Sequence, residues 1–218
     1  MNSANGFRYL LCDLDDTLYP PHTGLMPAIG QLIGHYMVER VNIPPEETNA
    51  LRRHYHQTYG TSLRGLIVNY DIDPESYLDF AHQVPVENFV QPNPALALML
   101  ESIPLTKVIF TNATREHAQR VMSILGIADC FDAVIDIRDS LYHSKPHAVA
   151  YQQALKILDI APLHCLFVED SAPNLAPART LGMTGILVGN NGGTDLATAA
   201  DIHIHDILQL ADVVLPLL

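Results

Sequence analysis

The sequence has few basic residues, and this shortage limits what the protein can bind. Lys and Arg number 12 against 24 for Asp and Glu among 218 residues, so the formal net charge at pH 7 is −12. A chain this acidic would meet a nucleic-acid backbone with the wrong sign of charge, which excludes a nucleic-acid polymer as an expected partner. Any phosphate group that it handles must be met locally, by a few basic side chains and a metal ion.

Cysteines and long apolar runs are also scarce. The three cysteines, Cys12, Cys130 and Cys165, have no C-x-x-C spacing, which favours buried free thiols in a reducing compartment over disulfides. No stretch approaches the ~18 continuous apolar residues of a membrane-spanning helix. The N-terminus lacks the basic region and apolar stretch of a signal peptide. We therefore expect a cytoplasmic protein with no membrane partner.

Short apolar runs rich in β-branched and aromatic residues recur along the chain and are typical of buried strands. They lie at 7–13, 106–112, 131–137, 164–170 and 184–189. Helical patterns separate the later runs: Thr114 is the predicted N-cap of a helix that ends at Gly126, and Gly182 ends another. Strands that alternate with such helices predict an α/β fold with a parallel sheet covered on both faces.

The interval 20–91 breaks this alternation. It contains no convincing strand, but apolar residues at helical spacing fall on one face over 25–37. Asp73 is the predicted N-cap of a later helix in the same interval. We interpret residues 20–91 as an inserted helical domain, and residues 1–19 together with 92–218 as the core.

Polar residues of reactive types stand at the ends of these apolar runs. They are Asp13, Asp15 and Asp16 after the first run, Thr111 and Asn112 after the second, Lys145 ahead of a predicted helix at 148–158, and Glu169 and Asp170 after the fourth run. In a parallel sheet the carboxyl ends of the strands meet at one edge, where ligands bind. Each group alone has an ordinary explanation, as a helix cap, a surface lysine or an acidic turn. Together they favour one site, because chance seldom puts a complete reactive set on successive strand ends.

These residues resemble the four motifs of the haloacid dehalogenase superfamily of phosphohydrolases. "LLCDLDDT" at 10–17 matches h-h-h-D-x-D-x-T, and "VIFTN" at 108–112 matches an apolar strand that ends in Thr or Ser. Lys145 matches the lysine ahead of a helix, and "LFVED" at 166–170 matches the acidic pair. The resemblance implies a Rossmann-like parallel-sheet core, and the helical interval suits members with an all-helical cap of the C1 type after the first motif.

The resemblance also implies four catalytic residues. Asp13 would attack phosphorus to form an aspartyl-phosphate. Asp15 would protonate the leaving oxygen and then take a proton from water. Thr111 would hold a phosphate oxygen, and Lys145 would offset the negative charge on Asp13 and on the phosphate.

Mg²⁺ is the implied cofactor, because phosphoryl transfer depends on positioning and on charge neutralisation. Its implied ligands are the Asp13 carboxylate, the Asp15 backbone carbonyl and Asp170. Glu169 would bind the metal through water or orient Asp170. Asp16 is expected to serve the turn that leads to the inserted helices.

Weaker signals narrow the resemblance to the pyrimidine 5′-nucleotidases, which remove phosphate from nucleoside monophosphates such as UMP and CMP. The stretches that carry it include "DLDDTLY", "HYHQTYGTSLRGL" and "EDSAPN". The small-molecule substrate would then be a nucleoside monophosphate, bound by Leu14 and Asn112 of the core and by Tyr59 and Arg64 of the insert. A salt bridge within the insert is an equal alternative for Arg64. The histidines show no metal-ligand pattern, and we interpret most of them as surface or packing residues.

Other functions are weighed against the same residues. A dehalogenase of this superfamily needs no acid-base residue, and Asp15 argues against it. A phosphosugar mutase stays an alternative, because the pair of Glu169 and Asp170 also occurs there. A phosphatase for another small phosphometabolite is a further alternative. A phosphorylation-sensing module would lack both the acid at the second position and the insert, and a non-catalytic binding protein would be free to lose Asp13 or Lys145. The oligomeric state is open, with a monomer as the expectation.

Overall fold

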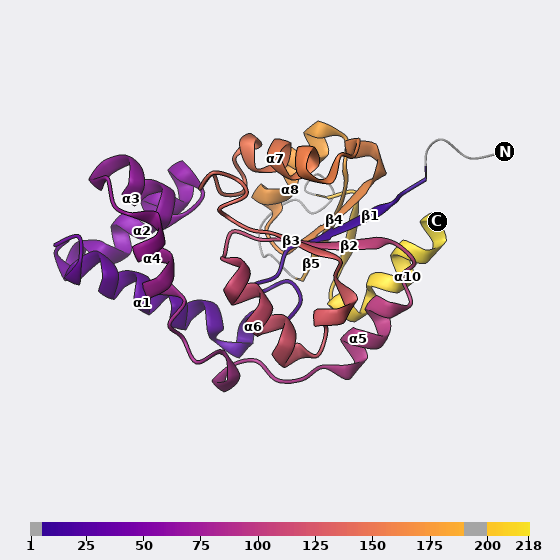
Figure 1. Ribbon diagram of the computed structural model, residues 1–218, viewed down its shortest axis with the longest axis horizontal. Coiled ribbons are helices and arrows are strands. Elements are labelled where there is room, and N and C mark those ends of the chain that lie inside the picture. The colour runs from indigo at the N-terminus through magenta and orange to yellow at the C-terminus, as the bar shows by residue number, and fades with distance from the viewer. Residues whose placement is uncertain (1–5, 190–199) are drawn as a thin grey trace.

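Six parallel strands form one sheet at the centre of the protein (Figure 1). The computed structural model describes residues 6–189 and 200–218 and has the strand order β3-β2-β1-β4-β5-β6. The strands are β1 (Tyr9–Cys12), β2 (Thr106–Phe110), β3 (Ala133–Ile135), β4 (Cys165–Glu169), β5 (Thr184–Val188) and β6 (Ile202–Ile204). The five apolar runs form β1 to β5, so the predicted α/β fold with a parallel sheet is confirmed. The prediction missed β6, because three residues with a polar His203 in the middle form no apolar run.

β1 lies between β2 and β4, and this topology positions the site. Tyr9 pairs with Thr106 on one side and with Cys165 on the other. Because all three strands run in the same direction, their carboxyl ends and the polar residues that follow lie at the same edge. The strand order reverses between β1 and β4, which is the point where open α/β sheets bind ligands.

Helices cover both faces of the sheet (Figure 1). Alternation along β1 puts Leu10 and Cys12 on one face and Leu11 on the other. The first face packs against α5 (Pro94–Glu101), α6 (Arg115–Leu125) and α10 (Leu210–Val214), and the second against α7 (Ala148–Leu158) and α8 (Ala172–Leu181). The predicted ends of α6 are confirmed: Thr114 accepts a hydrogen bond from the backbone N–H of His117, and Gly126 follows the helix in the left-handed conformation.

Four α-helices and no strand occupy residues 20–91, as predicted. They are α1 (Leu25–Glu39), α2 (Pro45–Tyr59), α3 (Ser62–Tyr70) and α4 (Pro74–Ala81). Asp73 caps α4, because its side chain accepts hydrogen bonds from the backbone N–H groups of Glu75 and Ser76. Most residues of one hydrophobic cluster come from these helices, and Ile137 of the core completes it. In this cluster Tyr36 makes an edge-on contact with Tyr77 at 5.3 Å between ring centres.

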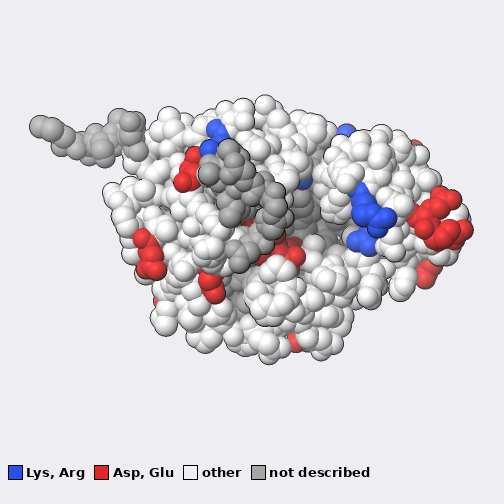
Figure 2. Space-filling view, turned by 180° about the vertical axis from the view of Figure 1, so that it is seen from behind, with Lys and Arg blue, Asp and Glu red and all other residues white. Residues whose placement is uncertain are grey.

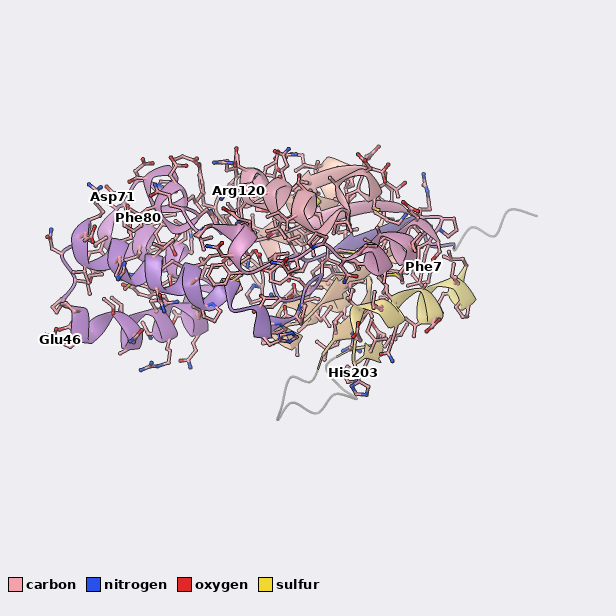
Figure 3. The ribbon with its side chains drawn as sticks, turned by 90° about the horizontal axis from the view of Figure 1, so that it is seen from below. Phe7, Glu46, Asp71, Phe80, Arg120 and His203 are labelled. Atoms are coloured by element: carbon pink, nitrogen blue, oxygen red, sulfur yellow. The ribbon has the colours of Figure 1, made fainter. Side chains whose placement is uncertain are left out.

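These four helices lie at one end of the long axis of the molecule (Figure 3). Glu46 and Asp71 mark that end, and Phe7 lies at the other. The division into a core and an inserted helical domain, with boundaries at residues 20 and 91, stays a prediction.

Membrane spans and cysteine pairing are two further features on which the sequence made a prediction. Within residues 6–189 and 200–218, no helix combines the length and apolar character needed to cross a membrane. All three cysteines are free, and Cys12 and Cys165 are buried, as expected. Burial raises the pKa of the Cys165 thiol to about 11, which makes it a packing residue and not a nucleophile.

Candidate active site

The polar residues predicted from the strand ends converge on one cavity of about 660 Å³. Residues of α1 to α4 form most of the opposite wall, and core residues such as Pro146 and Asn174 complete the lining. Figure 2 shows this hollow between the two parts of the molecule, with acidic side chains inside it and basic ones on the helical side. The strand-end residues that line the cavity are Asp13, Asp15, Asp16, Thr111, Asn112, Glu169 and Asp170.

Lys145 lies behind this wall and is 1% exposed. Its ammonium group donates hydrogen bonds to Asp13 Oδ1 at 2.6 Å, to Glu169 Oε2 at 2.9 Å and to the Phe110 carbonyl at 2.7 Å. These three bonds use every N–H that a lysine has. Burial by itself would lower the pKa of Lys145, but attraction to the two carboxylates outweighs burial and raises it. The lysine is therefore a fixed positive charge.

Asn112 holds the backbone of Lys145 in position. Its side-chain amide donates to the Lys145 carbonyl at 3.1 Å and accepts from the Lys145 N–H at 2.8 Å. One amide N–H and the amide oxygen thus hold Lys145, and the predicted binding role of Asn112 is that of its backbone N–H. Thr111 is 3% exposed, and its hydroxyl accepts a hydrogen bond from the Ala113 N–H at 3.0 Å. That contact leaves the hydroxyl proton of Thr111 available to the cavity.

Asp13, Glu169 and Asp170 form an acidic cluster whose ligand atoms lie within 4.8 Å of one another. Burial first, and then repulsion from Glu169, raises the pKa of Asp13 to about 7. Burial also raises the pKa of Glu169 to about 7, against the effect of Lys145. Three carboxylates thus face one ammonium group, and the negative charge in excess fits a divalent cation with oxygen ligands.

Thr17 ties this cluster to the segment after β1. Its hydroxyl lies 2.9 Å from Asp13 Oδ2, to which it donates, and 3.3 Å from Asp170 Oδ1. The backbone N–H of Asp170 donates to the same hydroxyl oxygen at 3.2 Å. The sequence analysis gave Thr17 no role beyond its place in the first motif, although a hydroxyl four residues after Asp13 is a signal that could have been used.

Asp15 is held by two side chains that the sequence analysis missed. Tyr19 Oη donates to Asp15 Oδ1 at 2.6 Å, and His117 Nε2 donates to the same oxygen at 2.9 Å. The carboxylate only accepts, so Nε2 carries the proton. Burial opposes ionisation of Asp15, but the charge and the N–H of His117 outweigh burial and lower the pKa.

His117 is wholly buried, and its ring stacks on that of His82 with 4.7 Å between ring centres. It is therefore neither a surface histidine nor only a packing residue. Its position was recoverable in principle, because it stands in the first turn of the helix after β2 and that turn lies at the site edge of the sheet. Burial lowers the pKa of His82 to about 3, so its ring is neutral.

The structure does not bring all of the predicted binding residues to the cavity. The Leu14 side chain is fully buried in the core, so only its backbone is left for binding. Arg64 and Tyr59 do not line the cavity, whereas Arg52 does. The Tyr59 ring packs instead on Tyr55, with 5.7 Å between ring centres.

Asp16 behaves as a turn residue, in agreement with its expected role. Its backbone has φ 62°, the left-handed conformation that Asp tolerates better than most residues. Burial and repulsion from Asp15 and Asp13 raise the pKa of Asp16 to about 6.

Comparison with known proteins identifies related chains. A family model described as haloacid dehalogenase-like hydrolase matches residues 7–182. Phosphate metabolism protein 8 of Saccharomyces cerevisiae is 26% identical over 192 residues, which are 80% of this chain and 59% of that protein. A phosphoglycolate phosphatase of Chromobacterium violaceum is 30% identical over 114 residues, 52% of this chain and 51% of that protein. This chain therefore spans between a half and three fifths of the length of these relatives.

A solved structure confirms the fold. The crystal structure of a HAD phosphatase from Thermococcus onnurineus superimposes with a TM-score of 0.64 at 19% identity, over 95% of this chain and 97% of that one. At this level of identity the likeness concerns the fold alone.

Glu169→Gln tests the electrostatics of the cluster. The pKa of Glu169 is raised from an ordinary value near 4.5 to about 7, so the native state binds its proton more tightly than the unfolded state does. In the presence of chelator, the free energy of unfolding of the wild type should therefore fall relative to that of the variant as the pH rises from about 4.5 to 7. The expected fall is roughly 1–3 kcal/mol. Urea unfolding at several pH values measures the difference. The exposed Glu101→Gln serves as the control, and a wild-type-to-variant difference independent of pH would contradict the prediction.

Proposed function

This chain belongs to the haloacid dehalogenase-like hydrolase family, and on that premise we propose that it is a Mg²⁺-dependent phosphomonoesterase for pyrimidine nucleoside 5′-monophosphates such as UMP and CMP. The observation that carries the proposal is the position of Asp13. Its carboxylate follows the central strand, is held by Lys145 and Thr17, and lines the same cavity as Asp15 and Thr111. A nucleophile, an acid-base residue and a phosphate-binding hydroxyl therefore share one enclosed space.

Asp13 is the proposed nucleophile. One of its oxygens accepts from Lys145 at 2.6 Å and the other from Thr17 at 2.9 Å. These two contacts orient the carboxylate, and the ammonium charge favours its ionised form. Attack on phosphorus forms the aspartyl-phosphate and breaks the bond to the leaving oxygen, while the Thr111 hydroxyl donates to a phosphoryl oxygen.

Asp15 is the proposed acid and base. It gives a proton to the leaving oxygen in the first step and takes one from the water that hydrolyses the aspartyl-phosphate in the second. The O–H of Tyr19 and the N–H of His117 fix the carboxylate for both steps. His117 lowers the pKa of Asp15 and so favours its ionised form. The ionised form is the one that takes a proton from water in the second step.

The metal is proposed to be Mg²⁺, held by the Asp13 carboxylate, the Asp15 backbone carbonyl and Asp170. Carboxylate oxygens in excess of the local positive charge suit this ion. When bound, it neutralises charge on the phosphoryl oxygens during transfer. Both Glu169 oxygens already accept hydrogen bonds, from Lys145 and from the Ser171 N–H at 3.2 Å. That occupancy favours a role for Glu169 in holding Lys145.

We further propose that residues 20–91 form a cap over a core of residues 1–19 and 92–218. Side chains of α1, α2, α3 and α4 line the cavity opposite the strand ends. Apolar and aromatic side chains in that wall, which include Met26, Ile29, Ile33 and Tyr77, suit a flat pyrimidine base. The printed names of the yeast and bacterial relatives concern phosphate metabolism and a phosphatase, which supports a phosphate-ester substrate.

A substrate panel tests the function. We expect phosphate release with Mg²⁺ to be fastest for UMP and CMP, slower for purine monophosphates, ribose 5-phosphate, 2-phosphoglycolate and lysophosphatidate. Equal rates across all classes would remove the nucleotidase assignment and leave the phosphatase. Dependence on a sugar bisphosphate activator would indicate a mutase, halide release from a 2-haloacid would indicate a dehalogenase, and a single turnover would indicate a phosphorylation-sensing module.

Asp13→Asn tests the nucleophile. The amide is a poor nucleophile of almost the same size, so turnover of UMP should fall by about 1,000-fold or more. Chelation of divalent metal should abolish wild-type turnover, and added Mg²⁺ should restore it. The exposed Asp129→Asn is the matched control. Substantial phosphate release by Asp13→Asn would contradict the mechanism.

His117→Gln tests the partner of Asp15. The amide keeps a donor but removes the imidazole charge, so the pKa of Asp15 should rise, and kcat should fall roughly 10- to 100-fold. The limb of the pH–rate profile that depends on ionised Asp15 should move to higher pH. The exposed His54→Gln should leave the profile unchanged. A profile that stays in place in His117→Gln would separate His117 from the acid-base function.

A further inference from the structure

Arg52 provides a positive charge on the helical side of the cavity. It lies on α2, and among the described residues that line the cavity it is the only Arg or Lys. Figure 2 shows basic side chains on the helical side of the hollow, away from the acidic ones inside it. Lys145 gives all three of its N–H groups to the core. Arg52 is thus the basic residue left to meet a ligand.

The Arg52 guanidinium makes no hydrogen bond and no ion pair within the described part of the protein, although its charge acts on Tyr77 and His56 of the same wall. Its Nε is buried and makes no hydrogen bond, and no hydrogen bond or ion pair joins the side chain to any described residue. A buried donor without an acceptor destabilises the fold. The Nη1 and Nη2 groups also make no hydrogen bond and, unlike Nε, are not buried, so they are the donors that a ligand in the cavity can reach.

The adjacent helix leaves room for this guanidinium. Gly30 of α1 faces it, and a Cβ at position 30 would lie 2.7 Å from Arg52 Nη2 and 3.5 Å from Cζ. Glycine within a helix is less favourable than alanine. The absence of a side chain at Gly30 therefore lets the guanidinium occupy its present position in the cavity wall.

We propose that Arg52 is a specificity-determining residue that donates hydrogen bonds to an acceptor oxygen on the leaving group of the substrate. This inference rests on the proposed phosphomonoesterase function. The phosphate is met by Thr111 and by the acidic cluster with its metal, at the strand ends, whereas Arg52 comes from the helical wall of the same cavity. The acceptor is a carboxylate, whose two oxygens match two parallel donors of the planar guanidinium, or a carbonyl oxygen of a pyrimidine base, which accepts from one of them.

Arg52→Gln with paired substrates tests the proposal. UMP and ribose 5-phosphate share the phosphorylated sugar and differ in the base, and 2-phosphoglycolate and 2-hydroxyethyl phosphate differ in the carboxylate. In whichever pair carries the natural acceptor, kcat/KM for the acceptor-bearing member should fall about 10- to 100-fold. The loss should come from a higher KM. For the member without the acceptor, kcat/KM should change by less than about twofold. The two pairs distinguish a base carbonyl from a carboxylate.

Arg53→Gln is the matched control. Arg53 is the next residue of α2, carries the same charge, is exposed and does not line the cavity. Its substitution should leave both substrate pairs unchanged. An equal effect of the Arg52 and Arg53 variants would reduce the role of Arg52 to a general charge effect and overturn the proposal.

Gly30→Ala provides a second test that keeps the charge. The added methyl group would push the flexible end of Arg52 away, and the helix itself should tolerate alanine. The same substrates should lose affinity, while the melting temperature stays the same or rises. Gly34→Ala, one turn later with nothing within 4 Å of the added Cβ, should change neither affinity nor preference.

The outcomes separate this inference from the function on which it rests. If the wild type hydrolyses none of the phosphate esters, the proposed function fails. If the wild type is active and Arg52→Gln lowers kcat/KM equally for both members of each pair, Arg52 binds the phosphate and the inference fails alone. An unchanged Arg52→Gln enzyme would overturn the inference as well.

Discussion

The ammonium group of Lys145 is buried between Asp13 and Glu169, and the rest of the site depends on this contact. Without the lysine, the two carboxylates would face each other in a space from which water is excluded, and one of them would have to take a proton. The contact joins β1, β4 and the segment ahead of α7, which are far apart in the chain. Asn112, after β2, holds the lysine backbone. The parallel sheet is what brings these four segments together.

The helical wall of the cavity is hydrogen-bonded to the segment that carries Lys145. The Ser144 hydroxyl donates to the Tyr59 carbonyl at 3.3 Å and accepts from the Thr61 hydroxyl at 3.2 Å. Farther out, the Arg138 guanidinium donates to both Glu75 oxygens, at distances between 2.8 and 3.0 Å. Because these contacts tie α2 and α4 to the core, the shape of the cavity and the position of the lysine share a common support.

In the proposed enzyme, the residues that react with phosphorus and the residue that selects the substrate lie in different parts of the fold. The groups that we propose act on phosphorus and on the leaving oxygen stand at strand ends, where a rigid sheet positions them and where the strand order reverses. The residue that we propose meets the rest of the leaving group stands on a helix, whose face can change without disturbing the sheet. Such a separation lets a family keep its core motifs while the substrate differs between members.

The sequence by itself determined strands β1 to β5, the helical character of residues 20–91 and the residues that converge at the strand ends, because each follows from a local pattern of apolar and polar residues. It could not determine which helical side chains face the cavity. Arg64 and Tyr59 were the predicted residues, yet α3 turns Leu63 and Leu66 inward, and it is Arg52 on α2 that lines the cavity. The sequence could place His117 near the site edge of the sheet, but not its pairing with Asp15, 102 residues earlier. Helix rotation and contacts between distant segments are set by packing in three dimensions, and only the tertiary structure decides them.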